Sequence, residues 1–97
     1  MKHAGAQALA ALEPLLEELR KTAGLVERKR GIFYRGAAAF VHFHEDSGGL
    51  FADLRNGDDW ERYAVNTRSE IARLLRAARL SATARPHSKS IRRPRSE

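Results

Sequence analysis

Residues 32–65 read IFYRGAAAFVHFHEDSGGLFADLRNGDDWERYAV. Short runs of β-prone side chains alternate here with Gly, Asn and Asp, the residue types typical of turns. The clearest turn signals are the DSGG segment at residues 46–49 and Asn56-Gly57. We expect strands at 32–35, 38–45, 50–55 and 60–65. This stretch therefore predicts an antiparallel meander of three or four strands.

A helical pattern precedes the meander, over about residues 6–23. Large and small apolar residues recur there at spacings of three and four, which places them in one stripe on a helix. The stripe contains Leu9, Leu12, Leu16, Leu19 and Ala23. Pro14 lies inside this stretch and cannot donate a backbone hydrogen bond. The sequence predicts either a kink at Pro14 or a stable helix that begins near it.

A second helix is expected after the meander. Thr67-Arg68-Ser69-Glu70 matches the capping box, in which Thr67 caps the first turn and Glu70 reaches back to it. An apolar stripe then continues along residues 71–78 and stops near Ser81. The helix is therefore predicted to begin at Thr67 and to end close to residue 80.

These elements predict an α+β fold of two layers, with the order α-β-β-β-(β)-α. Both helices are expected to pack on one face of the antiparallel meander. Residues 25–30 are charged and are predicted to be a connector between the first helix and the sheet. Residues 1–80 are predicted to form a single domain, and residues 81–97 to form a basic, flexible C-terminal tail.

Length and composition exclude several classes of protein. The chain has 97 residues, which is one domain at most. It has no Cys, so it cannot be a disulfide scaffold or a Cys-based zinc protein. No segment approaches the roughly 20 apolar residues that span a bilayer, and the N-terminal segment lacks the pattern of a signal peptide. We expect a small bacterial protein in the cytoplasm, with no membrane partner.

The positive charge is concentrated at the C-terminal end. The net charge is +6. Five basic side chains in residues 81–97 stand against Glu97 alone, which gives the tail +4 and leaves +2 for residues 1–80. The basic side chains are Arg85, Lys89, Arg92, Arg93 and Arg95. Such a tail either attracts nucleic-acid phosphates, in a salt-dependent way, or is simply a solvated end.

The predicted sheet has two unlike faces, because side chains alternate along a strand. If residues 46–49 form a four-residue loop, His42 lies opposite Asp53 and His44 opposite Phe51. One face is then almost wholly apolar and is expected under the helices. The other face mixes aromatic and charged side chains and is the predicted binding face. It contains Phe33, Arg35, Phe40, His42, His44, Phe51, Asp53 and Arg55.

Four interpretations of this second face stand side by side. The first is self-association, in which a homodimer buries the three Phe side chains. The second is a half-solvated face that the N-terminal arm or the tail partly covers. The third is a nucleic-acid platform, with Phe rings stacked on bases and Arg side chains on phosphates. The fourth is a metal or small-molecule site. The sequence favours a binding or assembly module that forms a dimer.

The metal hypothesis rests on three side chains of that face. His42 and His44 are two residues apart on one strand, so both point the same way. Asp53 is predicted to lie across from His42. Two imidazoles and one carboxylate suit zinc or iron. No third His is near in sequence, because His3 and His87 lie in the terminal segments.

The sequence carries no catalytic signature. It has no Gly-rich phosphate loop and no Cys nucleophile, and its Ser residues fall in turns, in a cap or in the tail. We therefore expect a binding protein rather than an enzyme, and we predict no cofactor. The metal site at the His-x-His strand is kept as an alternative.

The motifs of residues 31–36, 39–44 and 49–55 make the chain similar to small uncharacterised bacterial α+β proteins. In the order helix, meander, helix, it resembles the YjbR-like and YdhG-like groups over about residues 15–80. The resemblance implies a two-layer fold with helices on a curved antiparallel sheet, and nucleic-acid binding in some members. It lies in the pattern of elements and carries no functional residue over to this chain.

Overall fold

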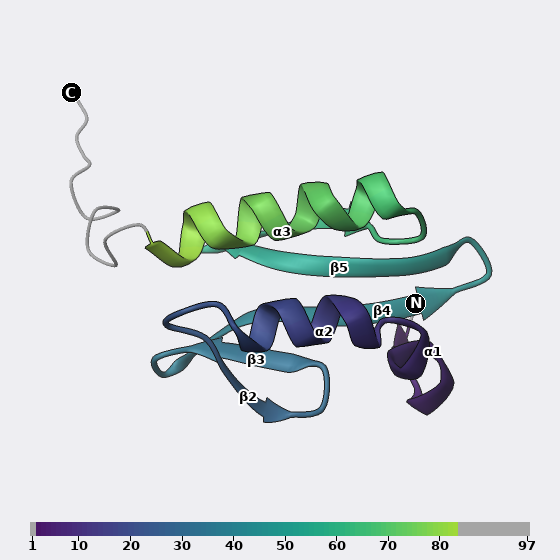
Figure 1. The fold of residues 1–97 in the computed structure, drawn as a ribbon, viewed down its shortest axis with the longest axis horizontal. Helices are drawn as coiled ribbons and strands as arrows, with labels where there is room; N and C mark the ends of the chain where they lie inside the picture. The colour runs from purple at the N-terminus through teal and green to yellow at the C-terminus, as the bar shows by residue number, and fades with distance from the viewer. Residues whose placement is uncertain (1, 84–97) are drawn as a thin grey trace.

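The computed structural model describes residues 2–83 and confirms the α+β class. Figure 1 shows a single antiparallel sheet with α2 and α3 on the same side of it. The sheet has six strands, more than the three or four predicted. The elements are β1 (Lys2–His3), α1 (Ala6–Ala11), α2 (Glu13–Arg20), β2 (Val26–Lys29), β3 (Ile32–Arg35), β4 (Ala38–Asp46), β5 (Gly49–Asn56), β6 (Asp59–Ala64) and α3 (Arg68–Thr83).

The strands β2 to β6 are neighbours in the order in which they occur along the chain. Each pair is antiparallel, as a meander requires. The predicted register of the central hairpin is confirmed, since Glu45 pairs with Leu50 and His42 with Asp53. The short strand β1 pairs with β4 through His3 and His44. It brings the N-terminal segment to the middle of the sheet.

The segment predicted as a charged connector contains a strand. β2 pairs with β3, and Gly31, with a φ of 81°, forms the turn between them. Because β2 is an edge strand, the side chains of Arg28 and Lys29 reach water and do not oppose pairing. Glu27 of β2 accepts hydrogen bonds from Arg20 of α2 and from the backbone of Gly31, which holds this edge against the helix layer.

The first helical pattern is interrupted between Ala11 and Glu13. Leu12 ends α1 and begins α2, and Pro14 lies in the first turn of α2, where its missing N–H costs no helical hydrogen bond. The stripe of Leu9, Leu12, Leu16 and Leu19 is buried as predicted, whereas its predicted last member, Ala23, lies beyond the end of α2 and is exposed. The break therefore turns the chain while the apolar stripe stays on the core.

The capping box of α3 is confirmed. The backbone N–H of Glu70 donates to Thr67 Oγ1 at 3.2 Å, and the backbone N–H of Thr67 donates to Glu70 Oε1 at 3.1 Å. The helix extends to Thr83, a few residues beyond its predicted end, and Ala82 belongs to the core. The nucleic-acid candidates Arg85, Lys89, Arg92, Arg93 and Arg95 lie outside the described residues, as does most of the predicted tail.

The predicted faces are correct for β5 and for residues 41–46 of β4, but wrong for β3 and for Phe40, which lies at the bulge in β4. A β-bulge shifts the β3–β4 register, so that Phe33 pairs with Val41 and shares its side of the sheet. Phe33 is fully buried and Phe40 is 4% exposed, and both belong to the core. Arg35 donates a hydrogen bond to the backbone oxygen of Ser81 in α3. These three residues therefore leave the predicted binding face.

None of the helices within residues 2–83 has the length and apolar content that a membrane span requires.

Candidate metal centre

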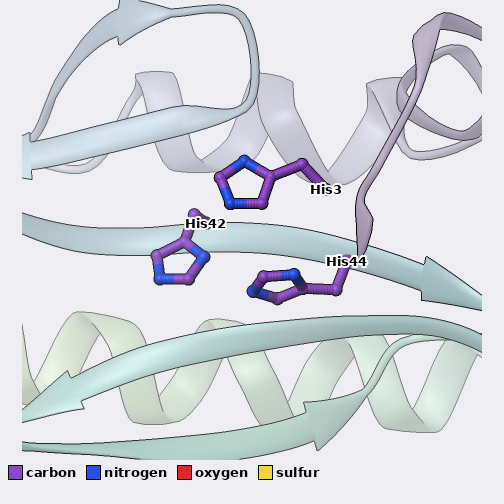
Figure 2. A group of neighbouring side chains, drawn as sticks. All are labelled: His3, His42 and His44. Atoms are coloured by element: carbon purple, nitrogen blue, oxygen red, sulfur yellow. The ribbon is translucent and has the colours of Figure 1, made fainter. Parts of the chain in front are cut away.

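Three histidines from two strands meet on the sheet face turned away from α2 and α3, which we call the outer face (Figure 2). His42 and His44 alternate along β4 with Val41 and Phe43, which are buried in the core. The alternation therefore turns both imidazoles outward. His3 pairs directly opposite His44, so its side chain joins the same face.

The three rings lie close together. One nitrogen from each ring can be chosen so that all three lie within 4.8 Å of one another. The ring centroids of His42 and His44 are 4.8 Å apart, and those of His3 and His44 are 5.0 Å apart. His3 stacks on His42 at 5.8 Å. Figure 2 shows the imidazoles turned toward a common point above β4.

Several of these nitrogens are buried without a hydrogen-bond partner in the part of the chain that the structure describes. They are Nδ1 of His42 and both ring nitrogens of His44. A buried polar atom without a partner costs about 1–3 kcal/mol, so folded proteins rarely keep several together. The structure thus concentrates unsatisfied donor atoms at one point, as a ligand site does.

Asp53 lies beside the histidines but is held by Arg62. The register places Asp53 of β5 between His42 of β4 and Arg62 of β6. The guanidinium of Arg62 donates from Nε to Oδ1 at 2.8 Å and from an Nη atom to Oδ2 at 2.9 Å. This bidentate pair lowers the pKa of Asp53 and raises that of Arg62. Asp53 is therefore a carboxylate whose charge is already paired.

His44 also contacts this carboxylate, but not through a hydrogen bond. His44 Nε2 lies 3.0 Å from Asp53 Oδ2. This contact does not have the geometry of a hydrogen bond, so Nε2 still lacks a hydrogen-bond partner among the described residues. The contact keeps the ring next to a negative charge and leaves its nitrogens available to a ligand.

His42 is held in its neutral form. Burial lowers the pKa of His42 below its ordinary value of 6.5, and the neighbouring His44 lowers it further. Neutral imidazole is the form that binds a metal ion, because protonation occupies the lone pair. At pH 7 His42 is therefore ready to act as a ligand.

An aromatic side chain lies against the cluster on the β6 side. The ring of Trp60 meets His42 edge to face at a centroid distance of 4.6 Å. The guanidinium of Arg55 lies 4.5 Å above the Trp60 ring and also donates to the backbone oxygen of Ala39. Trp60 thus packs against one side of His42, and Arg55 joins Arg62 as a second cation on the outer face.

Of the predicted binding face, five residues do come together on one side of the sheet. They are His42, His44, Phe51, Asp53 and Arg55. Phe33, Arg35 and Phe40 do not join them. The predicted metal triad changes as well, because Asp53 is bound to Arg62 and His3 provides the third imidazole.

Sequence reasoning missed His3, Trp60 and Arg62. The partners of Asp53 and Arg55 on β6 follow from a hairpin turn at Gly57 and Asp58, which pairs Asn56 with Asp59. This register was readable from the sequence. The pairing of β1 could not be predicted from the sequence, because a strand of two residues shows no alternation and its partner is some 40 residues away.

The donor set fits a transition-metal ion. Ligand nitrogens around a tetrahedral zinc ion at 2.0–2.1 Å are about 3.3 Å apart. In the structure the three chosen nitrogens lie up to 4.8 Å apart, so the imidazoles would have to move about 1.5 Å closer together to bind zinc. His3 is exposed, so a change of its side-chain rotamer meets little packing.

No protein-family model, curated protein or solved structure matches this chain.

Proposed function

We propose that this protein binds one divalent transition-metal ion through His3, His42 and His44. The observation that carries the proposal is the convergence of three imidazoles, two of which, His42 and His44, have buried nitrogens that lack hydrogen-bond partners within residues 2–83. Hydrogen bonds within the described chain do not satisfy these atoms. A metal ion at their common point would satisfy one nitrogen from each ring.

The donor type narrows the choice of ion. Three imidazoles suit zinc, copper and nickel, whereas calcium and magnesium prefer oxygen ligands. Zinc is our first candidate because it accepts a distorted tetrahedral set without electronic penalty. In a direct comparison of affinities, copper(II) is expected to bind more tightly than zinc, in line with the general order for divalent ions.

The proposal is tested by titrating the purified protein with zinc in isothermal calorimetry. One ion per chain should bind, and His42→Ala or His44→Ala should weaken binding by at least about 100-fold. Arg76→Ala is the control, because Arg76 is exposed on α3, on the other side of the sheet from the cluster, and it should bind as the wild type does. Circular dichroism verifies that the variants fold. Folded wild-type protein that binds neither zinc, nickel nor copper would refute the proposal.

Self-association remains a second candidate. The strand β6 has a neighbour on one side only within the described sheet, and Trp60 is 39% exposed on it. Unpaired edges and exposed aromatic side chains both favour contact with another chain. Sedimentation at high micromolar concentration tests this role, and a monomer would exclude a stable dimer. Nucleic-acid binding by the tail stays a prediction that the described residues do not address.

A further inference from the structure

We infer that the metal ion at this site keeps one coordination position open to solvent and binds a small anion there. The inference rests on the proposed function. It adds a ligand class, which is monovalent inorganic anions and small carboxylates. Zinc sites that use three protein ligands hold water or an exchangeable ligand in the fourth position. The question is whether this chain provides a fourth donor of its own.

The described residues offer no such donor. The group of side chains able to share an ion contains three histidines and no carboxylate. The carboxylates that lie beside the histidines in space or follow them in the sequence already accept hydrogen bonds from other groups. Asp53 is held at both oxygens by Arg62, Glu45 accepts from the backbone N–H of Gly5 at 2.6 Å, and Asp46 accepts from that of Gly48 at 2.7 Å.

The open position faces solvent. All three imidazoles rise from strands of one sheet, so the sheet lies on one side of the ion (Figure 2). His42 and His44 are half-buried, with His42 against Trp60, whereas His3 is exposed. The side of the ion away from β4, next to His3, is therefore where an outside ligand can enter.

The charge balance selects an anion. Three neutral imidazoles leave the full positive charge on a divalent ion. The negative charge of Asp53 is already neutralised by Arg62, and Arg55 brings one more cation to the same face. A bound anion would restore neutrality in a partly buried place, where electrostatic attraction is stronger than in water.

The experiment uses cobalt(II) in place of zinc, because its visible bands report the ligands around the ion. Full-length protein loaded with cobalt is titrated with azide and with acetate. Saturable changes in the visible bands are expected with the wild type. Bands that do not respond to either anion would overturn the inference. If no protein-bound cobalt bands form at all and zinc does not bind, the proposed function itself fails.

Two variants test whether the anion binds at a fourth coordination position that a carboxylate of this chain could also occupy. Arg62→Gln releases Asp53, which then has a free carboxylate beside the ion and should take the fourth position. This variant should lose the anion response and hold cobalt at least as tightly as the wild type. Arg55→Gln is the matched control, because it removes a cation from the same face without freeing Asp53, and it should keep the response. An unchanged response in folded Arg62→Gln would contradict the role given to Asp53.

Discussion

Thr67 fixes the start of α3 through its side-chain hydroxyl, which accepts the N–H of Glu70. We expect Thr67→Ala to lower the free energy of unfolding by about 1 kcal/mol, because the first turn loses a hydrogen-bond acceptor. Urea denaturation measures the change. Arg76→Ala, at an exposed site in the middle of α3, is the control and should stay within about 0.5 kcal/mol of the wild type. Equal midpoints for Thr67→Ala and the wild type would mean that this cap contributes nothing.

Side-chain alternation along a strand predicts correctly which sheet face most residues of β4 and β5 occupy, and it fails at the bulge between β3 and β4. On β4 and β5 the turn length sets the register, so the opposition of His42 and Asp53 was predicted and is confirmed. Between β3 and β4 one bulge, with Phe40 of β4 as the extra residue, shifts the register, and Phe33 lies in the core. A single extra residue reverses which side of a sheet a side chain reaches, and the sequence does not mark where it occurs.

Helix α2 and strand β2 are linked by a network of ion pairs around Arg20. Its guanidinium contacts Glu13, Glu17 and Glu27. Glu27 is the most buried of the three carboxylates, with 16% of its side chain exposed. The hydrogen bond from Arg20 lowers the pKa of Glu27 below its ordinary value of 4.5.

This network predicts a pH-dependent loss of stability. Because the pKa of Glu27 is lower in the folded chain, its stabilising effect is complete above about pH 4.5 and is lost as the pH falls through the folded-state value. Glu27→Gln should therefore lower the free energy of unfolding by about 2 kcal/mol at pH 7. The difference from the wild type should shrink progressively below pH 4.5. Denaturation curves at several pH values measure it.

Glu17→Gln provides the comparison for this prediction. Glu17 also contacts Arg20, but 56% of its side chain is exposed and the contact is 3.3 Å long. Water screens such a pair, so the change at pH 7 should be less than about 0.5 kcal/mol. If both variants cost the same, burial of Glu27 does not account for its effect.

Among the secondary-structure elements, the prediction for residues 25–30 was wrong, because it relied on their charge. A run of charged side chains is typical of a solvated connector, and here it forms β2. An edge strand tolerates charge on both faces, because much of its surface meets water. The pairing partner and the contact with Arg20 decide the structure, and neither is visible in the local sequence.

For the whole molecule, we expect a chain that ends at Thr83 to fold like the full protein. Ala82 is the last residue in the chain that belongs to the described core, and a truncation at Thr83 keeps it. Residues 84–97 show no apolar periodicity. The truncated chain should keep its denaturation midpoint and its zinc affinity. A clear loss of stability would show that the tail packs on the domain.

The truncation also separates the metal proposal from the nucleic-acid hypothesis. Removing residues 84–97 takes away five basic side chains, whereas the three histidines remain. If the full chain binds nucleic acid through its tail, the truncated chain should bind more weakly and with a flatter salt dependence. Equal binding by both chains would assign the contact to the folded domain instead.

The placement of β1 has a consequence for the order of folding. The strands β2 to β6 join by successive hairpins, which are local and form in about 1–10 μs. β1 must instead find β4 across some 40 residues of chain, so we expect this pairing to form more slowly than the hairpins. We therefore expect β1 to dock on β4 late in folding. Because β1 carries His3, the third proposed metal ligand should join His42 and His44 only at that late step, and a partly folded chain should bind zinc more weakly than the folded protein.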